Sequence, residues 1–278
     1  MGKIGRGWQL AKMSLRVIRK DKEMLLFPAL SGVISLLILG SFLGGMISYY
    51  GFTGIVDEAD PIILYVFFAV FYFVSFFLST FFSACIVGAA TIRMNGGNPT
   101  FSDGIKAATG CIKQILLWTL FAATVGLILR LIQNRLGLLG KIIVGALGMA
   151  FTVATYFVVP VLVYEKLGPW GALKRSVSVL KGAWGEALIG NLGLGAIFFL
   201  LGLLGAIPII AGFWIFTFWS VVIGAVIAIV YWLILGLIAA AASSVLLAAL
   251  YRYATTGKTA EEFGDLSFTN PWMATTAR

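Results

Sequence analysis

Histidine is absent from this 278-residue chain, and only 11% of its residues are charged. The commonest metal ligand and general base is therefore missing. The two cysteines, Cys85 and Cys111, cannot make a zinc site unaided, and we interpret them as reduced packing residues, not as a disulfide. Neither a phosphate-binding glycine loop nor a nucleophile-elbow pattern occurs. We therefore expect no catalytic residue, no metal and no cofactor, and a lipid-modifying enzyme is the least favoured class of function.

Apolar residues dominate what remains, since 60% of the chain is hydrophobic, against about 45–50% in soluble domains. This composition excludes a water-soluble protein. A helix needs about 20 apolar residues to cross a bilayer. Runs of that kind predict an all-α transmembrane bundle of six spans, at about Met24–Tyr50, Pro61–Ile92, Leu116–Ile132, Ile142–Tyr164, from Ala187 onward, and Trp219–Leu250.

Proline interrupts two of these runs. Pro160 is expected to kink the fourth span. Pro208 and Gly212 offer the only break in the last run, from Ala187 to Leu250, which is long enough for three crossings with almost no loops. A seven-span bundle is therefore the second interpretation of the same sequence.

Three basic segments beside the spans have helical periodicity, with apolar residues along one side and lysine or arginine elsewhere. This pattern is typical of an amphipathic helix that lies in the membrane interface. The apolar sides are Trp8, Ala11, Leu15 and Ile18 in the first segment, Ile105, Ala108, Ile112 and Ile115 in the second, and Trp170, Leu173, Val177, Leu180 and Trp184 in the third.

The three segments can be aligned, and each precedes a pair of spans. The first and third copies share four residue types, at Trp8, Lys12, Ser14 and Val17 and at Trp170, Lys174, Ser176 and Val179. We predict one membrane domain, residues 1–256, built from three repeat units, 4–97, 98–166 and 167–256, and a short polar tail, 257–278. The alternative is that any basic amphipathic helix beside a membrane has this pattern.

The distribution of basic residues predicts the orientation. Six spans place both termini on one side, which holds all but three of the 20 basic residues. Basic residues favour the cytoplasm, so we expect both termini there, in a protein of the cytoplasmic membrane. The net charge of +9 then indicates anionic lipid headgroups, and not nucleic acid, as the partner. The predicted headgroup contacts are Lys12, Arg16, Arg19, Lys106, Lys113, Lys174, Arg175 and Lys181.

The three remaining cations, Arg130, Arg135 and Lys141, lie between the third and fourth spans. They either concentrate anions at the outer mouth of a pore or extend from helix ends into lipid headgroups. Asn191, the most notable polar residue within a span, either lines a solute path or forms a hydrogen bond with a neighbouring helix. Glu165 is expected to pair with a basic residue of the third amphipathic segment.

The stretch Pro160–Glu186 reads P-V-L-V-x-E, then G-P-x-x-A-L-K-R-S, then L-K-x-x-W-G-E. With the opening G-R-G-W-x-L-A-K and the closing L-Y-R-Y-A-T-T-G, it resembles a prokaryotic family of integral membrane proteins of unknown function. Through A-L-K-R-S after a proline-containing span, the chain is more distantly similar to the membrane domain of some glycerophosphodiester phosphodiesterases, whose catalytic barrel it lacks. The resemblance implies a six-helix fold and brings no known reaction or ligand.

These observations favour a non-enzymatic membrane protein that acts as a scaffold or as a lipid-interacting component. Its expected partners are membrane lipids, together with further copies of itself or other membrane proteins. The alternative function is a passive channel or transporter for a small solute such as an anion, with the three outer cations at its mouth.

Overall fold

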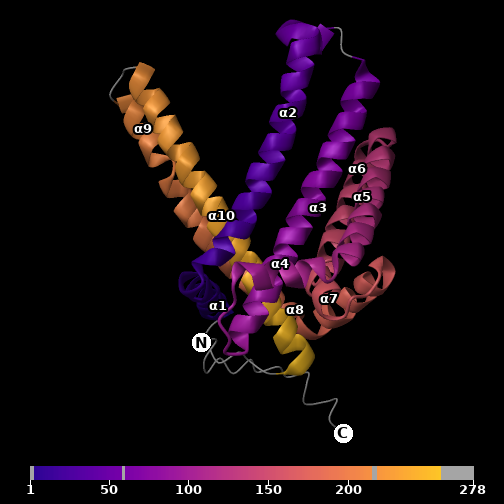
Figure 1. Ribbon diagram of the computed structural model, residues 1–278, viewed down its shortest axis with the longest axis vertical. Coiled ribbons are helices and arrows are strands. Elements are labelled where there is room, and N and C mark those ends of the chain that lie inside the picture. Colours follow the sequence, from indigo (N-terminus) through magenta and orange to yellow (C-terminus); the bar gives the residue numbers. More distant parts are fainter. Residues whose placement is uncertain (1–2, 58–59, 215–217, 258–278) are drawn as a thin grey trace. The chain divides into compact units, whose positions relative to one another are not determined.

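The computed structural model describes residues 3–57, 60–214 and 218–257, and all regular structure within them is helical (Figure 1). Most of the predicted polar tail, residues 258–278, lies outside the described residues. The elements are α1 (Lys3–Lys20), the short 3-10 helix η1 (Lys22–Leu25), α2 (Leu26–Asp57), α3 (Pro61–Met94), α4 (Phe101–Thr109), α5 (Ile112–Arg135), α6 (Leu138–Ala154), α7 (Val158–Tyr164), α8 (Pro169–Leu204), α9 (Ile207–Trp214) and α10 (Phe218–Thr256).

Six helical segments within the described residues are long and apolar enough to cross a membrane, as in a multi-pass membrane protein. In hydrocarbon a backbone must satisfy its own polar groups, so uncharged runs of this length form helices. The six segments are Lys22–Gly51, Ile62–Met94, Ile112–Gln133, Gly140–Tyr164, Ala187–Trp214 and Phe218–Thr256. The described residues thus contain six candidate spans, the number predicted from sequence.

The last apolar run gives two candidate spans. The break at Pro208 interrupts the helix inside the first of them, Ala187–Trp214, and does not end that span. Pro208 has no N–H to donate to the carbonyl of Leu204, so α8 ends there and α9 follows after a two-residue turn. Two donors from α10 bond carbonyls just before this turn. The Tyr231 hydroxyl donates to Leu201 O at 2.7 Å, and the Trp232 indole N–H donates to Gly202 O at 2.9 Å.

The kink expected at Pro160 lies one turn before that residue. Helix α6 ends at Ala154 and α7 begins at Val158, so residues 155–157 interrupt the fourth span. The pyrrolidine ring of a proline clashes with the carbonyl four residues earlier, here that of Tyr156, and this displaces the break toward the N-terminus. The result is a short, largely buried α7.

The described chain divides into two compact units. The first comprises Met1–Leu25, Ile86–Phe101 and Ser178–Arg278, and within it α10 packs against both α1 and α9. The second comprises Leu26–Cys85 and Ser102–Val177, and within it α5 packs against α6. The predicted threefold repeat concerns sequence register, which these packing units do not test.

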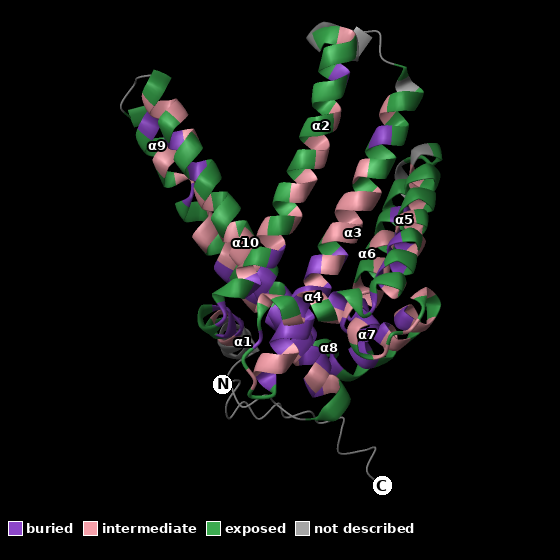
Figure 2. Ribbon diagram, in the orientation of Figure 1, coloured by how far each residue is buried: buried purple, intermediate pink, exposed green. Residues whose placement is uncertain are grey.

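Burial is concentrated at one end of the longest helices (Figure 2). In α10 the buried residues cluster after Ala241, whereas the half that begins at Phe218 is mostly exposed. In α3 the stretch from Ala84 to Ala90 is almost fully buried, whereas Ile62 and Tyr65 are exposed. The buried end of each of these two helices is also the end nearer the basic segments in the sequence, so the candidate site lies beside buried residues.

Candidate functional site

Helix α1 presents a row of cations on one side and a buried strip on the other. Ser14, Val17 and Ile18 are at most 4% exposed. Lys12, Arg16 and Arg19 are exposed and are spaced i, i+4, i+7, so they share one face of the helix. We call these three residues the α1 ridge. The side chains of Trp8 and Ala11, predicted for the apolar side, lie outside the described residues.

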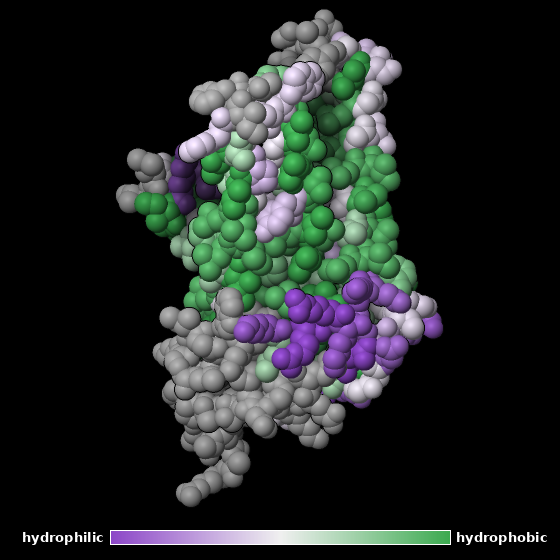
Figure 3. All heavy atoms as spheres, turned by 90° about the vertical axis from the view of Figure 1, so that its left-hand side faces the viewer, coloured by the Kyte–Doolittle hydropathy of each residue, from purple (hydrophilic) through white to green (hydrophobic). Residues whose placement is uncertain are grey.

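Two features hold the α1 ridge outward. The buried strip of α1 packs against α10 within the same unit, which fixes the rotation of the helix about its axis. The chain then enters the first candidate span at Lys22, and η1 is the first turn of that span. On the side where α1, α9 and α10 lie, hydrophilic residues form a band beside the apolar surface (Figure 3).

The other predicted headgroup contacts have different surroundings. Lys113 and Lys181 are exposed. Lys106 lies 4.0 Å from the carboxylate of Asp103, with three quarters of its side chain exposed. Lys174 places its ammonium 5.5 Å from the centroid of the Trp170 ring, a cation–π arrangement. These lysines keep their charges near solvent, as a headgroup contact requires.

Arg175 has a protein partner. Its Nε donates to Oε1 of Glu165 at 2.7 Å, and both side chains are partly buried. The pairing predicted for Glu165 with a basic residue of the third segment is therefore confirmed. Because this carboxylate already holds Arg175, Lys174 and Lys181 are the better placed headgroup contacts on α8.

The predicted apolar side of the third segment is buried at one residue and exposed at two others. Leu180 is 6% exposed, whereas Trp170 is 60% and Trp184 is 50% exposed. Ala172, Ser176 and Ala183 on the other side are fully buried. Lipid and protein interior are both apolar, so hydrophobicity alone does not distinguish the two faces. Small residues face the protein because they let helices approach closely.

The second segment also follows its predicted apolar side in part, since Ala108 and Ile115 are fully buried. Helix α4 ends at Thr109, and Ile112 already begins the third span, with 45% of its surface exposed. Gly104 packs so closely that a Cβ there would lie 2.5 Å from Cζ of Phe27 and 3.0 Å from the carbonyl oxygen of Cys85. Again a small residue marks the face that packs against the protein.

Three positions of the predicted repeat are buried in every copy. They are Ser14, Ile18 and Asp21 in the first copy, Cys111, Ile115 and Trp118 in the second, and Ser176, Leu180 and Ala183 in the third. The helix is also interrupted at the same register in two copies, because α1 ends just before Asp21 and Ala183 has non-helical angles. The repeat itself stays a prediction.

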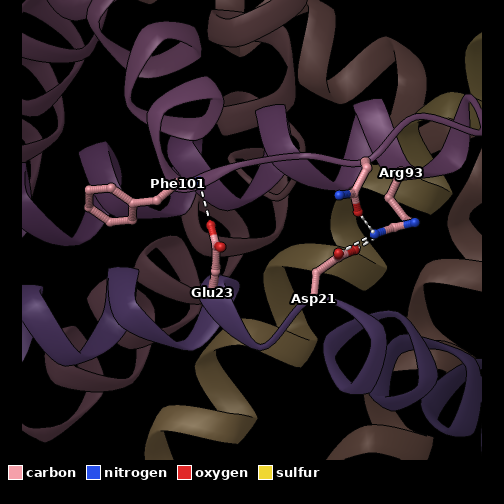
Figure 4. Close-up of polar contacts among 5 residues, drawn as sticks. Asp21, Glu23, Arg93 and Phe101 are labelled. Carbon is pink, nitrogen blue, oxygen red and sulfur yellow. Dashed lines mark hydrogen bonds and ion pairs between the residues drawn. The ribbon is translucent and has the colours of Figure 1, made fainter.

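A polar cluster that sequence reasoning missed lies at the packed end of the first unit (Figure 4). The Asp21 carboxylate accepts two hydrogen bonds from the guanidinium of Arg93, and Asp21 is only 7% exposed. Arg93 also donates to Oδ1 of Asn98 at 2.6 Å. Two acidic residues within a strongly basic stretch, Asp21 and Glu23, are the signal that could have revealed it.

Nearby contacts satisfy the ends of two helices. Glu23 accepts a hydrogen bond from the backbone N–H of Phe101 at 2.7 Å and so caps the start of α4. Arg252 donates to the carbonyl oxygen of Met94, the last residue of α3, at 2.7 Å. From sequence, Arg252 counts only as part of a basic surface. In the structure, Glu23 and Arg252 both stabilise helix ends in the first unit.

Ser176 fills the break in the fourth span. Its hydroxyl donates to the carbonyl oxygen of Ala154 at 2.6 Å and accepts from the N–H of Phe157 at 3.0 Å. Both backbone groups lost their helical partners at the break. A buried serine thus replaces two helical hydrogen bonds, the role that Ser and Thr side chains take in proline-broken membrane helices.

The remaining predicted residues lie apart from these contacts. Arg130, Arg135 and Lys141 are exposed on the hairpin of α5 and α6. Asn191 is exposed on α8, and its side chain forms no hydrogen bond with another described residue. Both cysteines are buried and free. Burial raises the pKa of the Cys111 thiol, and the Lys166 ammonium opposes that rise in part.

The contacts described above do not include an arrangement of side chains typical of a catalytic centre. Within the described residues no group of three or more histidine, cysteine or acidic side chains is placed to hold a metal ion. No curated protein and no solved structure matches the chain, so neither links it to the glycerophosphodiester phosphodiesterases. Residues 59–261, well over half of the sequence, match the Family of unknown function (DUF6159), and the chain belongs to that family.

Proposed function

We propose that this protein is a non-enzymatic, multi-pass component of the cytoplasmic membrane that binds anionic lipid headgroups on its basic side. The α1 ridge is the observation that carries the proposal. Lys12, Arg16 and Arg19 share one exposed face, and the opposite face of the helix is buried against α10. Arg16 and Arg19 make no ion pair with any other described residue.

Connectivity argues for a lipid partner. Only Asp21 separates the end of α1 from the first candidate span, which begins at Lys22, so the ridge cannot lie far from the membrane boundary. A basic residue near an anionic leaflet contributes about 1 kcal/mol of attraction. A nucleic acid of the same charge would have to approach a surface that the bilayer already occupies. With the basic side in the cytoplasm, as proposed, the ridge faces the leaflet that carries anionic lipid.

The test compares two variants with the same change in charge. Arg16→Gln with Arg19→Gln removes two cations from the ridge, and Arg130→Gln with Arg135→Gln removes two exposed cations from the α5–α6 hairpin. Each protein is purified from mixed phosphatidylglycerol and phosphatidylethanolamine vesicles, and the retained lipid is measured by native mass spectrometry. We expect the ridge variant to lose about 2 kcal/mol of headgroup attraction, roughly thirtyfold in affinity.

The hairpin variant is expected to keep the enrichment of phosphatidylglycerol seen with the unmodified protein. High salt should weaken the enrichment in the unmodified protein, because exposed charges are screened beyond about 10 Å at 0.1 M salt. Equal retention of anionic lipid by both variants would contradict the proposal. A folded protein that shows no lipid preference at all would contradict it as well.

The channel or transporter function remains the alternative proposal. Its basis is the exposed group Arg130, Arg135 and Lys141, which carries no acidic partner in the same loop. Anion flux into vesicles containing purified protein tests it, with a triple alanine variant at these positions for comparison. Flux no greater than in protein-free vesicles would exclude the channel and leave the lipid-binding proposal intact. Scaffolding through self-association, or with other membrane proteins, is compatible with either function.

A further inference from the structure

We propose that the first half of α8 is a membrane-surface anchor, in which Trp170 inserts among lipid headgroups with Lys174 beside it on the phosphates. This inference rests on the proposed lipid-binding function and names a second contact surface. It differs from the α1 ridge in chemistry, because an aromatic ring and a cation are combined. The occupant is the lipid surface itself.

The rotation of α8 about its axis is fixed by contacts on one face. Ser176 is fully buried and bonds both ends of the break between α6 and α7. Ala172, one turn earlier on the same face, is also fully buried. Arg175 is held by Glu165 at 2.7 Å. These contacts all lie in the second unit, and together they leave the opposite face of the helix outward.

Trp170 and Lys174 occupy that outward face. They are one helical turn apart, and the Lys174 ammonium lies 5.5 Å from the centroid of the Trp170 ring. The ring remains 60% exposed despite this contact. Its other neighbour is Phe121 of α5, which meets it edge-on at 6.4 Å between centroids.

The position of the pair along the chain identifies lipid as the occupant. The fourth span ends at Tyr164 and the fifth begins at Ala187, so the intervening segment is tethered to the membrane at both ends. Phe121 belongs to a third candidate span, Ile112–Gln133, so the ring of Trp170 packs beside a helix that is itself apolar enough to cross the membrane. Tryptophan is enriched at this level because its ring is apolar and its N–H is polar.

Charge complementarity supports the same assignment. The lysine side chain can lay its methylenes along the ring while its ammonium reaches lipid phosphate. A soluble protein partner would have to approach a ring flanked by a spanning helix. Trp170, which sequence places on the apolar side of this segment, thus contacts lipid in this proposal.

The experiment measures the depth of Trp170 in neutral phosphatidylcholine nanodiscs. Lipids brominated near the headgroup end or near the methyl end of their acyl chains quench nearby tryptophan. The contribution of Trp170 is the emission of the unmodified protein minus that of the Trp170→Phe variant. We expect at least twofold stronger quenching of this contribution by the shallow bromines than by the deep ones, and little quenching by aqueous iodide.

Strong quenching by iodide with none by either bromolipid would overturn the proposal, because the ring would then face water or a soluble partner. Stronger quenching by the deep bromines would overturn it too. Because the lipid is neutral, this result does not depend on the anionic preference of the α1 ridge. Failure of the anchor and failure of the proposed function are therefore separate outcomes.

Lys174 has its own arm of the test. Adding phosphatidylglycerol to the nanodiscs should increase shallow quenching of Trp170 in the unmodified protein, because the lysine is drawn toward the phosphates. The Lys174→Gln variant should show no such increase. The same increase in both proteins would remove Lys174 from the anchor. The Lys141→Gln variant, which changes an exposed lysine on the α5–α6 hairpin of the same unit, is the matched control and should keep the increase.

Discussion

The two halves of α10 differ in how they use apolar residues. The half that begins at Phe218 exposes large side chains, with Trp219 at 68% and Leu233 at 61% exposed. The other half contains Ala241 and Ala242, which are fully buried. Both halves are strongly apolar, and Arg252 near the end of the second is the one charged residue in α10, so hydrophobicity does not separate them. The packed half differs by its run of small residues, 239–244, next to buried large residues such as Leu246 and Leu250.

Helix α3 repeats the contrast. Tyr65 and Phe68 are 75% and 54% exposed in its first half, whereas Ala84 and Ala90 are fully buried in its second. In a bilayer, lipid tails compete equally for any large apolar side chain, so helices associate where small residues allow close contact. A run of small residues, and not greater hydrophobicity, therefore marks the packed end of these two helices, and large residues such as Ile86 and Leu246 are buried beside it.

Polar contacts follow the packed ends. The Asp21–Arg93 pair and the bond from Arg252 to Met94 lie at that end of the first unit. Ser176 lies in the corresponding part of the second. A polar group away from water must be satisfied by protein, so it is stable only where neighbouring helices are close. This comparison can be tested by single substitutions.

The largest effect is expected from Asp21→Asn. Asp21 and Arg93 have side chains that are 6% and 16% exposed. The substitution removes the carboxylate charge that pairs with the largely buried Arg93, and breaking comparable buried pairs costs about 3–5 kcal/mol. The free energy of unfolding, measured in detergent micelles by denaturant titration, should fall by roughly this amount.

Two companions make this prediction sharp. The neighbouring Lys22 is exposed, so Lys22→Gln should change stability by less than about 0.5 kcal/mol. Asp21→Asn combined with Arg93→Gln removes both charges and should recover part of the loss. An unfolding free energy for Asp21→Asn equal to that of Lys22→Gln would show that the ion pair does not hold the packed end.

A smaller loss is expected from Gly104→Ala. The added Cβ would lie 2.5 Å from Phe27, which is only 1% exposed, and 3.0 Å from a backbone oxygen. Overpacking of this kind costs about 1–3 kcal/mol. Gly126, with no atom within 4 Å of an added Cβ, is the control, and Gly126→Ala should leave the melting temperature unchanged or raise it. Equal melting temperatures for the two variants would contradict the role of small residues in close packing.

The number of spans was predictable from sequence because hydrocarbon demands long uncharged helices. Their approximate ends followed from the positions of charge and proline. The face of each basic segment that packs against protein was predictable only in part. Ile18, Ala108 and Leu180 of the predicted apolar sides are buried, whereas Trp170 and Trp184 are exposed, because a helical wheel cannot tell lipid from protein.

Charged residues were misjudged for a related reason. A sequence count assigns every arginine on the basic side to the surface, but Arg93 and Arg175 pair with Asp21 and Glu165. Only the second pair was expected, because its partners are close in sequence. The first joins residues far apart in sequence, and Asp21 itself is an acidic exception within a basic stretch.

Ser176→Ala should lower the free energy of unfolding by less than Asp21→Asn and by no more than Gly104→Ala. It removes one donor and one acceptor that serve the carbonyl of Ala154 and the N–H of Phe157. Leaving such buried groups unsatisfied costs about 1–3 kcal/mol. Ser178 is exposed two residues later, and Ser178→Ala is the control. Hydrogen exchange at Phe157 should accelerate only in the Ser176 variant, and unchanged exchange there would argue against the bond.

The smallest effect concerns the Cys111 thiol, whose pKa is raised by burial. The folded thiol keeps its proton to a higher pH than the unfolded one, so this thiol does not change the free energy of unfolding at pH 7. The free energy of unfolding falls only as the pH rises above the ordinary thiol pKa and through the folded pKa. In a Cys85→Ala background, Cys111 should therefore resist maleimide at pH 8, whereas a thiol at the exposed neighbouring site in a Cys111→Ala, Lys113→Cys variant should react readily. Equal alkylation rates at the two positions would mean that the packed end opens freely, and the contrast between the two ends of the helices would not hold.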